Sequence, residues 1–137
     1  MQAETYRGTV YTWHCDFNNH MNVMHYVGMF DQATWHFFAS LGITPDYLRS
    51  NNKGMFAVEQ HIKYLKELQA GDLVHIQTEL LEMKPKIIIF KHYMYNSSTQ
   101  DVAAETRLVG AHVDQTLRKT VLFPEDILNN AAKILKQ

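Results

Sequence analysis

The sequence predicts an α+β domain in which an antiparallel five-stranded sheet wraps around one long central helix. The helix is indicated by apolar residues that recur at intervals of three and four between about residues 22 and 42. One strand pattern precedes this helix, and four patterns of alternating apolar and polar residues follow it. Because a half-apolar sheet must bury its apolar face, and only the central helix is large enough to cover it, we expect the sheet to curl around that helix.

The first strand is predicted at residues 5–13, which are rich in β-branched and aromatic side chains, with Gly8 as a bend or bulge. A polar loop then leads into the helix, whose start is capped by Asn19 or Asn22. Gly42 suits the left-handed residue that ends a helix. Apolar residues extend around much of the cylinder, so we expect the helix to be covered on most sides.

The second half of the chain changes to a period of two residues. We expect a short helix at 44–49, strands at 56–66, 74–80, 86–95 and 102–115, and a terminal helix that opens at Pro124. The run Ile87–Phe90 indicates a strand buried on both faces. Short turns join the consecutive strands, which favours antiparallel pairing in sequence order, as in a meander.

Length and composition limit the class of protein. With 137 residues the chain is expected to form one domain over residues 1–137. A net charge of -1 gives no general attraction for nucleic acid or for an anionic membrane, so we expect neither as a partner. A single cysteine excludes an internal disulfide framework, and the amino terminus lacks a signal-peptide pattern. We therefore expect a cytoplasmic protein.

The segment Asp16-Phe-Asn-Asn-His20-Met-Asn22, the helix that follows it, and the turn at 70–72 together resemble the hotdog fold. Within that fold they are similar to thioesterases of the 4-hydroxybenzoyl-CoA thioesterase type. The resemblance covers about residues 5–123. It implies hydrolysis of an acyl-CoA thioester without a metal or an organic cofactor, in a homodimer or a dimer of dimers. The exposed edges of a single curled sheet also favour association.

In that family the aspartate that matches Asp16 acts as nucleophile or as general base for water, and the amino end of the central helix polarises the thioester carbonyl. Backbone N–H groups near residues 22–24 would supply this oxyanion site, aided by the helix dipole. Val23 stands where the hydroxybenzoyl enzymes have a tyrosine, which disfavours an aromatic acyl group. We expect His20 and Asn22 to orient Asp16, water or substrate, and Val23, Met24 and Tyr26 to bind substrate.

Charged residues elsewhere give further candidates. Glu59 is a second candidate catalytic carboxylate that could face the site across a subunit interface, and Asp31 in the helix is similar. Lys86 and Arg118 are candidates for the coenzyme A phosphates, because their side chains pair with phosphate oxygens. Other cations in the same role are Lys84, Arg107 and Lys119. A solvated surface explains all of these residues as well.

Several alternatives remain open from the sequence. Asp16 is also explained as a turn residue, and Asn22 as a cap alone. Cys15 is better explained as an apolar filler than as a nucleophile, and the eight histidines lack the spacing of a metal site. A non-catalytic acyl-thioester-binding protein, or a hydrolase of acyl carrier protein thioesters, is the alternative function. A hotdog hydratase is disfavoured, because no Gly-Pro-rich loop is present. The acyl group also stays open. Either an apolar acyl tunnel or simple core packing explains Met24, Met29, Trp35, Phe38 and Met55, and His or aromatic residues could equally hold a small polar or cationic acyl group.

Overall fold

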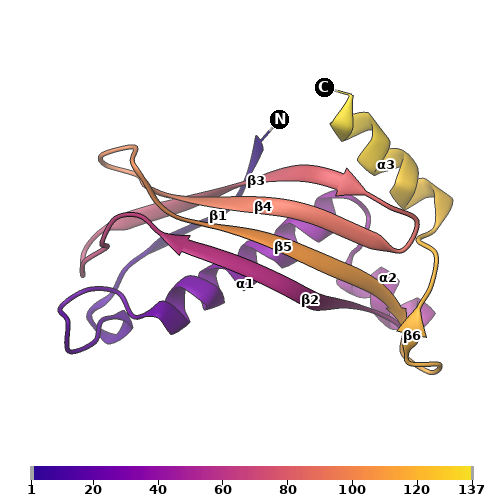
Figure 1. The fold of residues 1–137 in the computed structure, drawn as a ribbon, viewed down its shortest axis with the longest axis horizontal. Coiled ribbons are helices and arrows are strands. Elements are labelled where there is room, and N and C mark those ends of the chain that lie inside the picture. The colour runs from indigo at the N-terminus through magenta and orange to yellow at the C-terminus, as the bar shows by residue number, and fades with distance from the viewer. Residues whose placement is uncertain (1, 137) are drawn as a thin grey trace.

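A computed structural model describes residues 2–136 and places their strands in one antiparallel sheet. The strand order is β1 (Gln2–Thr9), β3 (Leu73–Met83), β4 (Ile87–Asn96), β5 (Val102–Asp114) and β2 (Lys53–Tyr64), with the two-residue strand β6 (Lys119–Thr120) paired to the end of β5. Figure 1 shows the long sheet with α1 (Val23–Ser40) running along one of its faces. The predicted sheet wrapped around a central helix is thereby confirmed.

The predicted order of pairing is wrong at one strand. β3, β4 and β5 form a meander, but β2 pairs with β5 and lies at the edge of the sheet. The connection from β2 to β3 is not a tight turn: Leu65 N–H and Lys66 N–H both donate to Ala103 O, at 2.8 and 3.0 Å. Leu68 then enters the core, fully buried. This anchored segment carries the chain away from β2, and no strand of the described part of the chain pairs with the outer edge of β2.

The first strand is shorter than predicted, and its irregularity lies elsewhere. β1 ends at Thr9 because its partner β3 begins at Leu73, opposite Thr9. Residues 12–14 instead form one turn of 3-10 helix, η1 (Thr12–His14). The register shifts between Glu4 and Tyr6, not at Gly8. The extra residue, Thr5, turns its hydroxyl inward to lie 2.8 Å from that of Thr78.

α1 starts at Val23 because Asn22 accepts a hydrogen bond from Met24 N–H at 3.0 Å. Asn19 is not the cap; it adopts the left-handed conformation at φ 60° in the preceding turn. Gly42, at φ 98°, follows the end of α1 as predicted. One face of α1 packs into the core against the sheet. That face consists of Tyr26, Met29, Phe30, Ala33, Phe37 and Phe38.

The expectation that α1 is covered on most sides is wrong for a single chain. The side chains of Val23, Met24, Val27 and Trp35 are 55, 66, 38 and 41% exposed. At 100° per residue, Val23, Val27, Asp31 and Trp35 share one stripe beside the buried face. We call this stripe the open face of α1. Val27, Asp31 and Trp35 of the open face line a cavity together with residues of β2, the edge strand.

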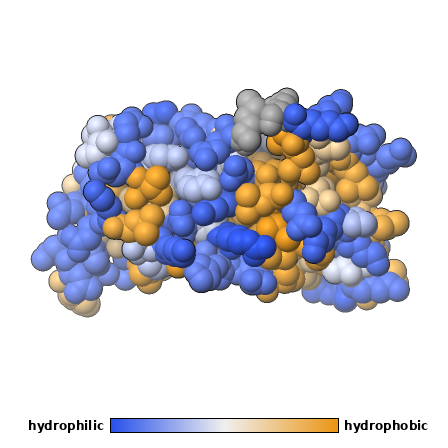
Figure 2. All heavy atoms as spheres, turned by 45° about the horizontal axis from the view of Figure 1, so that its top comes forward, coloured by the Kyte–Doolittle hydropathy of each residue, from blue (hydrophilic) through white to orange (hydrophobic). Residues whose placement is uncertain are grey.

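Two further helices lie toward the end of the molecule opposite the loop that precedes α1. Thr44 caps α2 (Pro45–Asn51), as the sequence predicts, by accepting from Tyr47 N–H at 3.0 Å. α3 (Glu125–Leu135) packs beside β3 and the end of α1, where Asn130 donates to Leu41 O at 2.9 Å. In the view of Figure 2, most hydrophobic side chains gather on the right half of the face, the side on which α3 lies. The left half is mostly hydrophilic and carries a smaller hydrophobic patch.

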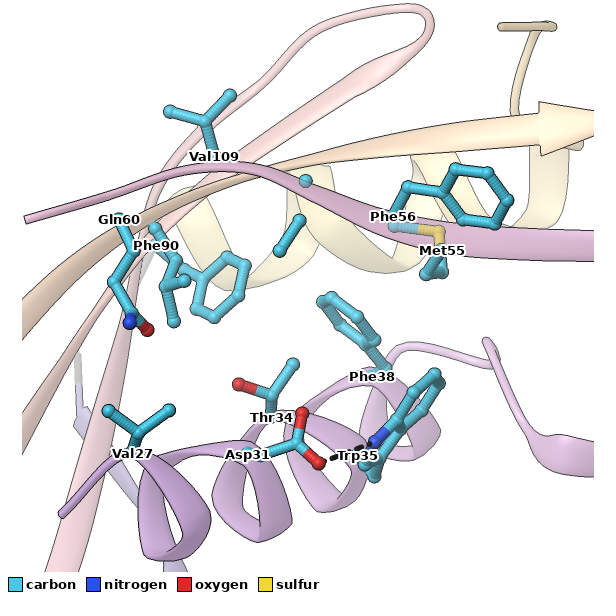
Figure 3. A pocket seen from close by; sticks show the side chains of 13 residues that line it. Val27, Asp31, Thr34, Trp35, Phe38, Met55, Phe56, Gln60, Phe90 and Val109 are labelled. Atoms are coloured by element: carbon cyan, nitrogen blue, oxygen red, sulfur yellow. Dashed lines mark hydrogen bonds between the residues drawn. The ribbon is translucent and has the colours of Figure 1, made fainter. Parts of the chain in front are cut away.

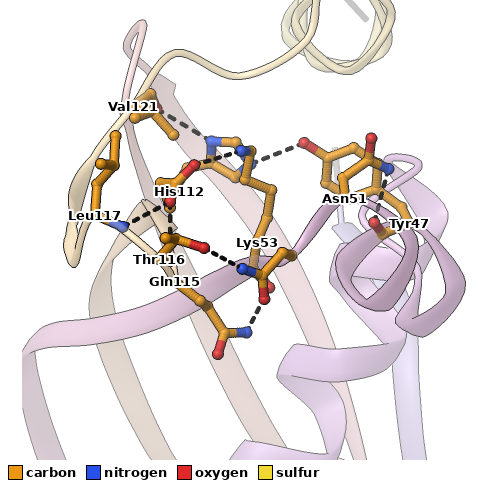
Figure 4. A network of polar contacts seen from close by, with 10 residues as sticks. Tyr47, Asn51, Lys53, His112, Gln115, Thr116, Leu117 and Val121 are labelled. Atoms are coloured by element: carbon orange, nitrogen blue, oxygen red, sulfur yellow. Dashed lines mark hydrogen bonds and ion pairs between the residues drawn. The ribbon is translucent and has the colours of Figure 1, made fainter.

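Polar contacts around His112 fix the end of the sheet near α2 (Figure 4). The ring of His112 lies 2.9 Å from the hydroxyl of Tyr47 and 3.1 Å from Val121 O. Beside it, Lys53 donates to Asp114 at 2.8 Å, and this bond is the main reason that the pKa of Asp114 is lowered to about 2. These bonds join α2, β2 and β5, so contacts within the chain hold this end of the sheet together.

Candidate functional site

Asp16 is held by two hydrogen bonds within its loop. Its Oδ1 accepts from Asn18 N–H at 2.8 Å, and its Oδ2 accepts from the side-chain amide of Asn22 at 2.8 Å. Both bonds favour the carboxylate form and lower the pKa of Asp16, the Asn18 bond most, against an opposing effect of desolvation. The loop therefore presents an ionised and oriented carboxylate at the start of α1.

Backbone donors at the start of α1 are mostly occupied. Asn22 N–H donates to His14 O at 2.8 Å, Met24 N–H donates to the Asn22 side chain, and His25 N–H donates to Asn22 O at 3.0 Å. Among residues 2–136, Val23 N–H has no protein partner. Of the N–H groups that the sequence suggested for an oxyanion site, the structure thus leaves Val23 N–H available.

His20 lies between two carboxylates. Its Nδ1 is 3.0 Å from Glu67 Oε1, and its Nε2 is 4.0 Å from Asp16 Oδ1. Glu67 was not a candidate from the sequence, because it lies in the connection after β2 with no local pattern to mark it. His20, Val23 and Tyr26 line a shallow groove with Glu67. Tyr26 itself is 4% exposed, and burial raises its pKa to about 12, so it belongs mainly to the core.

An open recess surrounds Asp16 and carries exposed apolar groups. Trp13 and Phe17 are 68 and 103% exposed, and with Met24 they line this recess beside Asp16 and Asn22. Cys15 also lines it, but is partly buried and packs against the core, with its thiol 3.8 Å from Tyr11 O. The predicted site residues Asp16, Asn22 and Met24 are therefore brought together.

A separate, more enclosed cavity of about 230 Å³ lies between α1 and the strands (Figure 3). The open face of α1 forms its floor, and β2, β4 and β5 form its walls. Trp35, Phe38 and Met55, which the sequence suggested as tunnel residues, line it, whereas Met29 is buried in the core. The lining consists of Val27, Asp31, Thr34, Trp35, Phe38, Met55, Phe56, Ala57, Gln60, Phe90, Leu108, Val109 and Gly110.

Three predicted site residues lie away from Asp16 within one chain. Glu59 lines neither the recess nor the cavity; its exposed carboxylate is 3.9 Å from Arg107. Lys86 precedes β4, and Arg118 lies in the turn between β5 and β6 with its guanidinium 5.5 Å from the ring centroid of Phe56. In Figure 1 that turn is at the right end of the sheet, whereas the loop before α1 is at the left end.

Within residues 2–136, no three His, Cys, Asp or Glu side chains are grouped to hold a metal ion. No helix in the same range combines the length and apolarity needed to cross a membrane.

Comparison with known proteins shows that the sequence of this chain is similar to those of thioesterases. The family model described as the Thioesterase-like superfamily matches residues 10–131. The L-carnitine dehydrogenase/betainyl-CoA thioesterase of Agrobacterium fabrum is 29% identical over 82% of this chain, which spans 23% of that protein. The betainyl-CoA thioesterase of Pseudomonas aeruginosa is 24% identical, and the match covers 90% of this chain and 78% of the relative.

A solved structure supports the fold. A Staphylococcus aureus protein in complex with CoA superposes with a TM-score of 0.91 at 22% identity, and the match covers 99% of this chain and 86% of that one. At this identity the similarity shows the hotdog fold, not the activity.

Proposed function

The chain belongs to the thioesterase-like superfamily, and from that premise we propose that it hydrolyses an acyl-CoA thioester to the free acid and coenzyme A. One observation carries this proposal: the oriented carboxylate of Asp16 lies in the loop that leads directly to Val23, whose backbone N–H has no partner among residues 2–136. A nucleophile or base and an oxyanion donor are the two groups that acyl transfer needs.

The chemistry is within the reach of these two groups. A thioester carbonyl is activated, and its thiol leaving group has a pKa of roughly 8.5, so no strong acid is required. Asp16 either attacks the carbonyl carbon and expels the thiolate, leaving a mixed anhydride that water cleaves, or removes a proton from an attacking water. In both routes Val23 N–H donates to the oxygen that becomes negative, and the positive end of the α1 dipole adds to this stabilisation.

The side chains around Asp16 prepare it for either route. Its lowered pKa keeps it ionised at neutral pH. Asn22 fixes the direction of one carboxylate oxygen, and His20, held by Glu67, lies on the other side of the same group. We propose positioning roles for Asn22 and His20.

We further propose that the chain acts as one hotdog domain in a homodimer formed through β2. Within the described residues 2–136 the outer edge of β2 has no partner strand, and Val58 on this strand is 60% exposed. An unpaired edge with apolar side chains favours continuation of the sheet by a second copy. Glu59, Lys86 and Arg118 then contribute to catalysis or phosphate binding only if they reach the site of the other subunit.

The first experiment measures thiol release from a panel of acyl-CoA thioesters by wild type and Asp16→Asn. The names of the curated relatives make betainyl-CoA the first member of the panel. We expect turnover of at least one thioester and a loss of roughly a hundredfold or more in Asp16→Asn, as for removal of a general catalyst. Cys15→Ser, one residue away in the same recess, is the matched control and should keep its activity.

Other results would select the alternatives. Full activity in Asp16→Asn would refute the carboxylate mechanism. Binding of acyl-CoA without thiol release would identify a non-catalytic binding protein. Turnover of acyl carrier protein thioesters but not of acyl-CoA thioesters would show that the substrate carrier is acyl carrier protein and not coenzyme A.

A further inference from the structure

The cavity on the open face of α1 is acidic and contains no base. Of its thirteen lining residues, Asp31 alone is charged at neutral pH, and the others are apolar or neutral. We infer that this cavity selects a short acyl group that ends in a quaternary ammonium. The inference rests on the proposed thioester hydrolysis and names its substrate class.

Asp31 has no cationic partner among the residues that the structure describes. Its Oδ2 accepts a hydrogen bond from Trp35 Nε1 at 3.3 Å, and within residues 2–136 it forms no ion pair. Figure 3 shows Asp31 rising from α1 beside Trp35, toward the strands that form the opposite wall. Asp31 is an exposed residue that lines an apolar cavity and has no neighbouring base. Its carboxylate attracts a ligand cation most strongly where the bound ligand displaces water from the apolar walls.

Aromatic rings beside Asp31 complete the recognition of a cation. The rings of Trp35 and Phe38 are nearly perpendicular, with an interplanar angle of 89° and centroids 5.9 Å apart, so they form two sides of a corner. Ring faces attract quaternary ammonium groups through their quadrupoles. The ring of Phe56, by contrast, already contacts the guanidinium of Arg118.

The polar groups of the cavity favour a quaternary over a primary ammonium. The hydroxyl of Thr34 is already engaged, at 3.0 Å from Phe30 O and 2.8 Å from His92 Nε2. Apart from Asp31, only the side chain of Gln60 remains as a polar partner on the walls. A primary ammonium has three N–H donors to satisfy, whereas a trimethylammonium has none. The cavity therefore matches a cation that presents methyl groups.

The position of Asp31 fits the length of a betainyl group. Asp31 follows Val23 by eight residues, roughly 12 Å along α1, and its side chain leans back toward the helix start, so its carboxylate is roughly 10 Å from Val23 N–H. With the acyl carbonyl on Val23 N–H, a betainyl nitrogen lies roughly 6 to 7 Å from that amide. Contact through a methyl group adds about 4 Å. The two lengths agree.

The test compares two thioesters that differ only in charge. Betainyl-CoA carries a trimethylammonium where 3,3-dimethylbutanoyl-CoA carries a tert-butyl group of the same shape. We expect wild type to prefer betainyl-CoA by about tenfold or more in kcat/KM. Asp31→Asn keeps an acceptor for Trp35 but should lose this preference, because its kcat/KM should fall for betainyl-CoA and stay the same for the neutral thioester. Asp31→Glu should retain part of it.

Two variants control for other effects. Asp126→Asn removes the same charge from exposed α3, outside the cavity, and should leave the ratio of the two substrates unchanged. Trp35→Leu removes one side of the aromatic corner and should lower kcat/KM for betainyl-CoA several-fold more than for its neutral analogue. Thermal unfolding of each variant shows whether the fold is kept.

The outcomes separate this inference from the proposed function. Hydrolysis of both thioesters at equal rates, or a ratio that Asp31→Asn leaves unchanged, would overturn the cation site and leave the thioesterase standing. If no thioester releases thiol, the proposed function fails, and calorimetric binding of the same two thioesters still decides the site. Tighter binding of betainyl-CoA that depends on Asp31 supports it, and equal binding refutes it.

Discussion

Asn22 joins the Asp16 carboxylate to the central helix, because its side-chain amide donates to Asp16 Oδ2 at 2.8 Å while its Oδ1 accepts from Met24 N–H at 3.0 Å. One side chain thus orients Asp16 and caps α1. The direction of the carboxylate is therefore set by hydrogen bonds from Asn18 and Asn22 within the same loop.

Replacing Asn22 by serine separates these two roles. Serine is a good helix cap but is too short to donate to Asp16 from this position, so we expect kcat to fall about tenfold with little change in stability. Asn22→Ala should lose the same activity and about 1 kcal/mol of the free energy of unfolding as well. Steady-state kinetics of both variants measure kcat, and urea unfolding measures the free energy of unfolding. Equal kcat in wild type and Asn22→Ser would show that the Asp16 contact has no catalytic role.

The pH dependence of hydrolysis should report the same contact. Asp16 has a lowered pKa, so kcat/KM should stay constant from neutral pH downward and fall only below the ordinary aspartate value of 3.8. In Asn22→Ser the bond that favours the carboxylate is lost, and the acid limb should move to higher pH. The Asn18 bond remains and limits this movement. An acid limb at the same pH in both proteins would contradict the assignment.

Stability at low pH should depend on His92. Its ring is fully buried, 2.6 Å from the Thr78 hydroxyl, and burial lowers its pKa from 6.5 to about 3. The unfolded chain therefore binds a proton near pH 6.5 that the folded chain does not, so the free energy of unfolding is greatest above pH 6.5 and declines below it. At pH 5 the loss from this group is about 2 kcal/mol.

Urea unfolding at pH 8, 6 and 5 checks this prediction with His92→Asn as comparison. The variant should be less stable at pH 8, because packing is lost, but its stability should change less with pH. His14 and His112 also have pKa values lowered by burial, so the difference between the two proteins isolates His92. Parallel pH profiles would rule out its role.

The β2 edge should control assembly. We expect wild type to be a dimer or larger, and Val58→Lys to shift it toward monomer, because a lysine on an edge strand opposes sheet extension. Leu122→Lys is the matched control, since Leu122 is 64% exposed outside the sheet. Light scattering after gel filtration measures the mass. A monomeric wild type, or a dimer that survives Val58→Lys, would refute the β2 interface.

Local patterns predicted most of the fold because each is caused by neighbouring residues. The cap at Thr44, the left-handed Gly42 and the buried stripe from Tyr26 to Phe38 follow from spacing alone. The position of β2 does not, since it depends on Leu68 entering the core across the connection to β3. Nonlocal packing of this kind leaves no short-range pattern.

In the candidate site, too, residues close in sequence were predictable and residues distant in sequence were not. Asp16, His20 and Asn22 lie within one loop, so their closeness was predictable, whereas the contacts of Asp16 with Asn22 and His20 are seen only in the structure. Glu67 reaches His20 from 47 residues away, and the walls around Asp31 come from strands far along the chain. From sequence alone, Asp31 could not be distinguished from a solvated helix residue, although its i, i+4 spacing to Trp35 is visible.

The constant pitch of α1 has a consequence for the evolution of selectivity. If acyl groups lie along the open face, the helix acts as a ruler that starts at Val23, and each turn marks about 5 Å of acyl length. Exchanging residues 31 and 35 would move the carboxylate one turn farther from Val23. Relatives could thus change the chain length they accept by single substitutions on the helix, while the loop that performs the reaction stays the same.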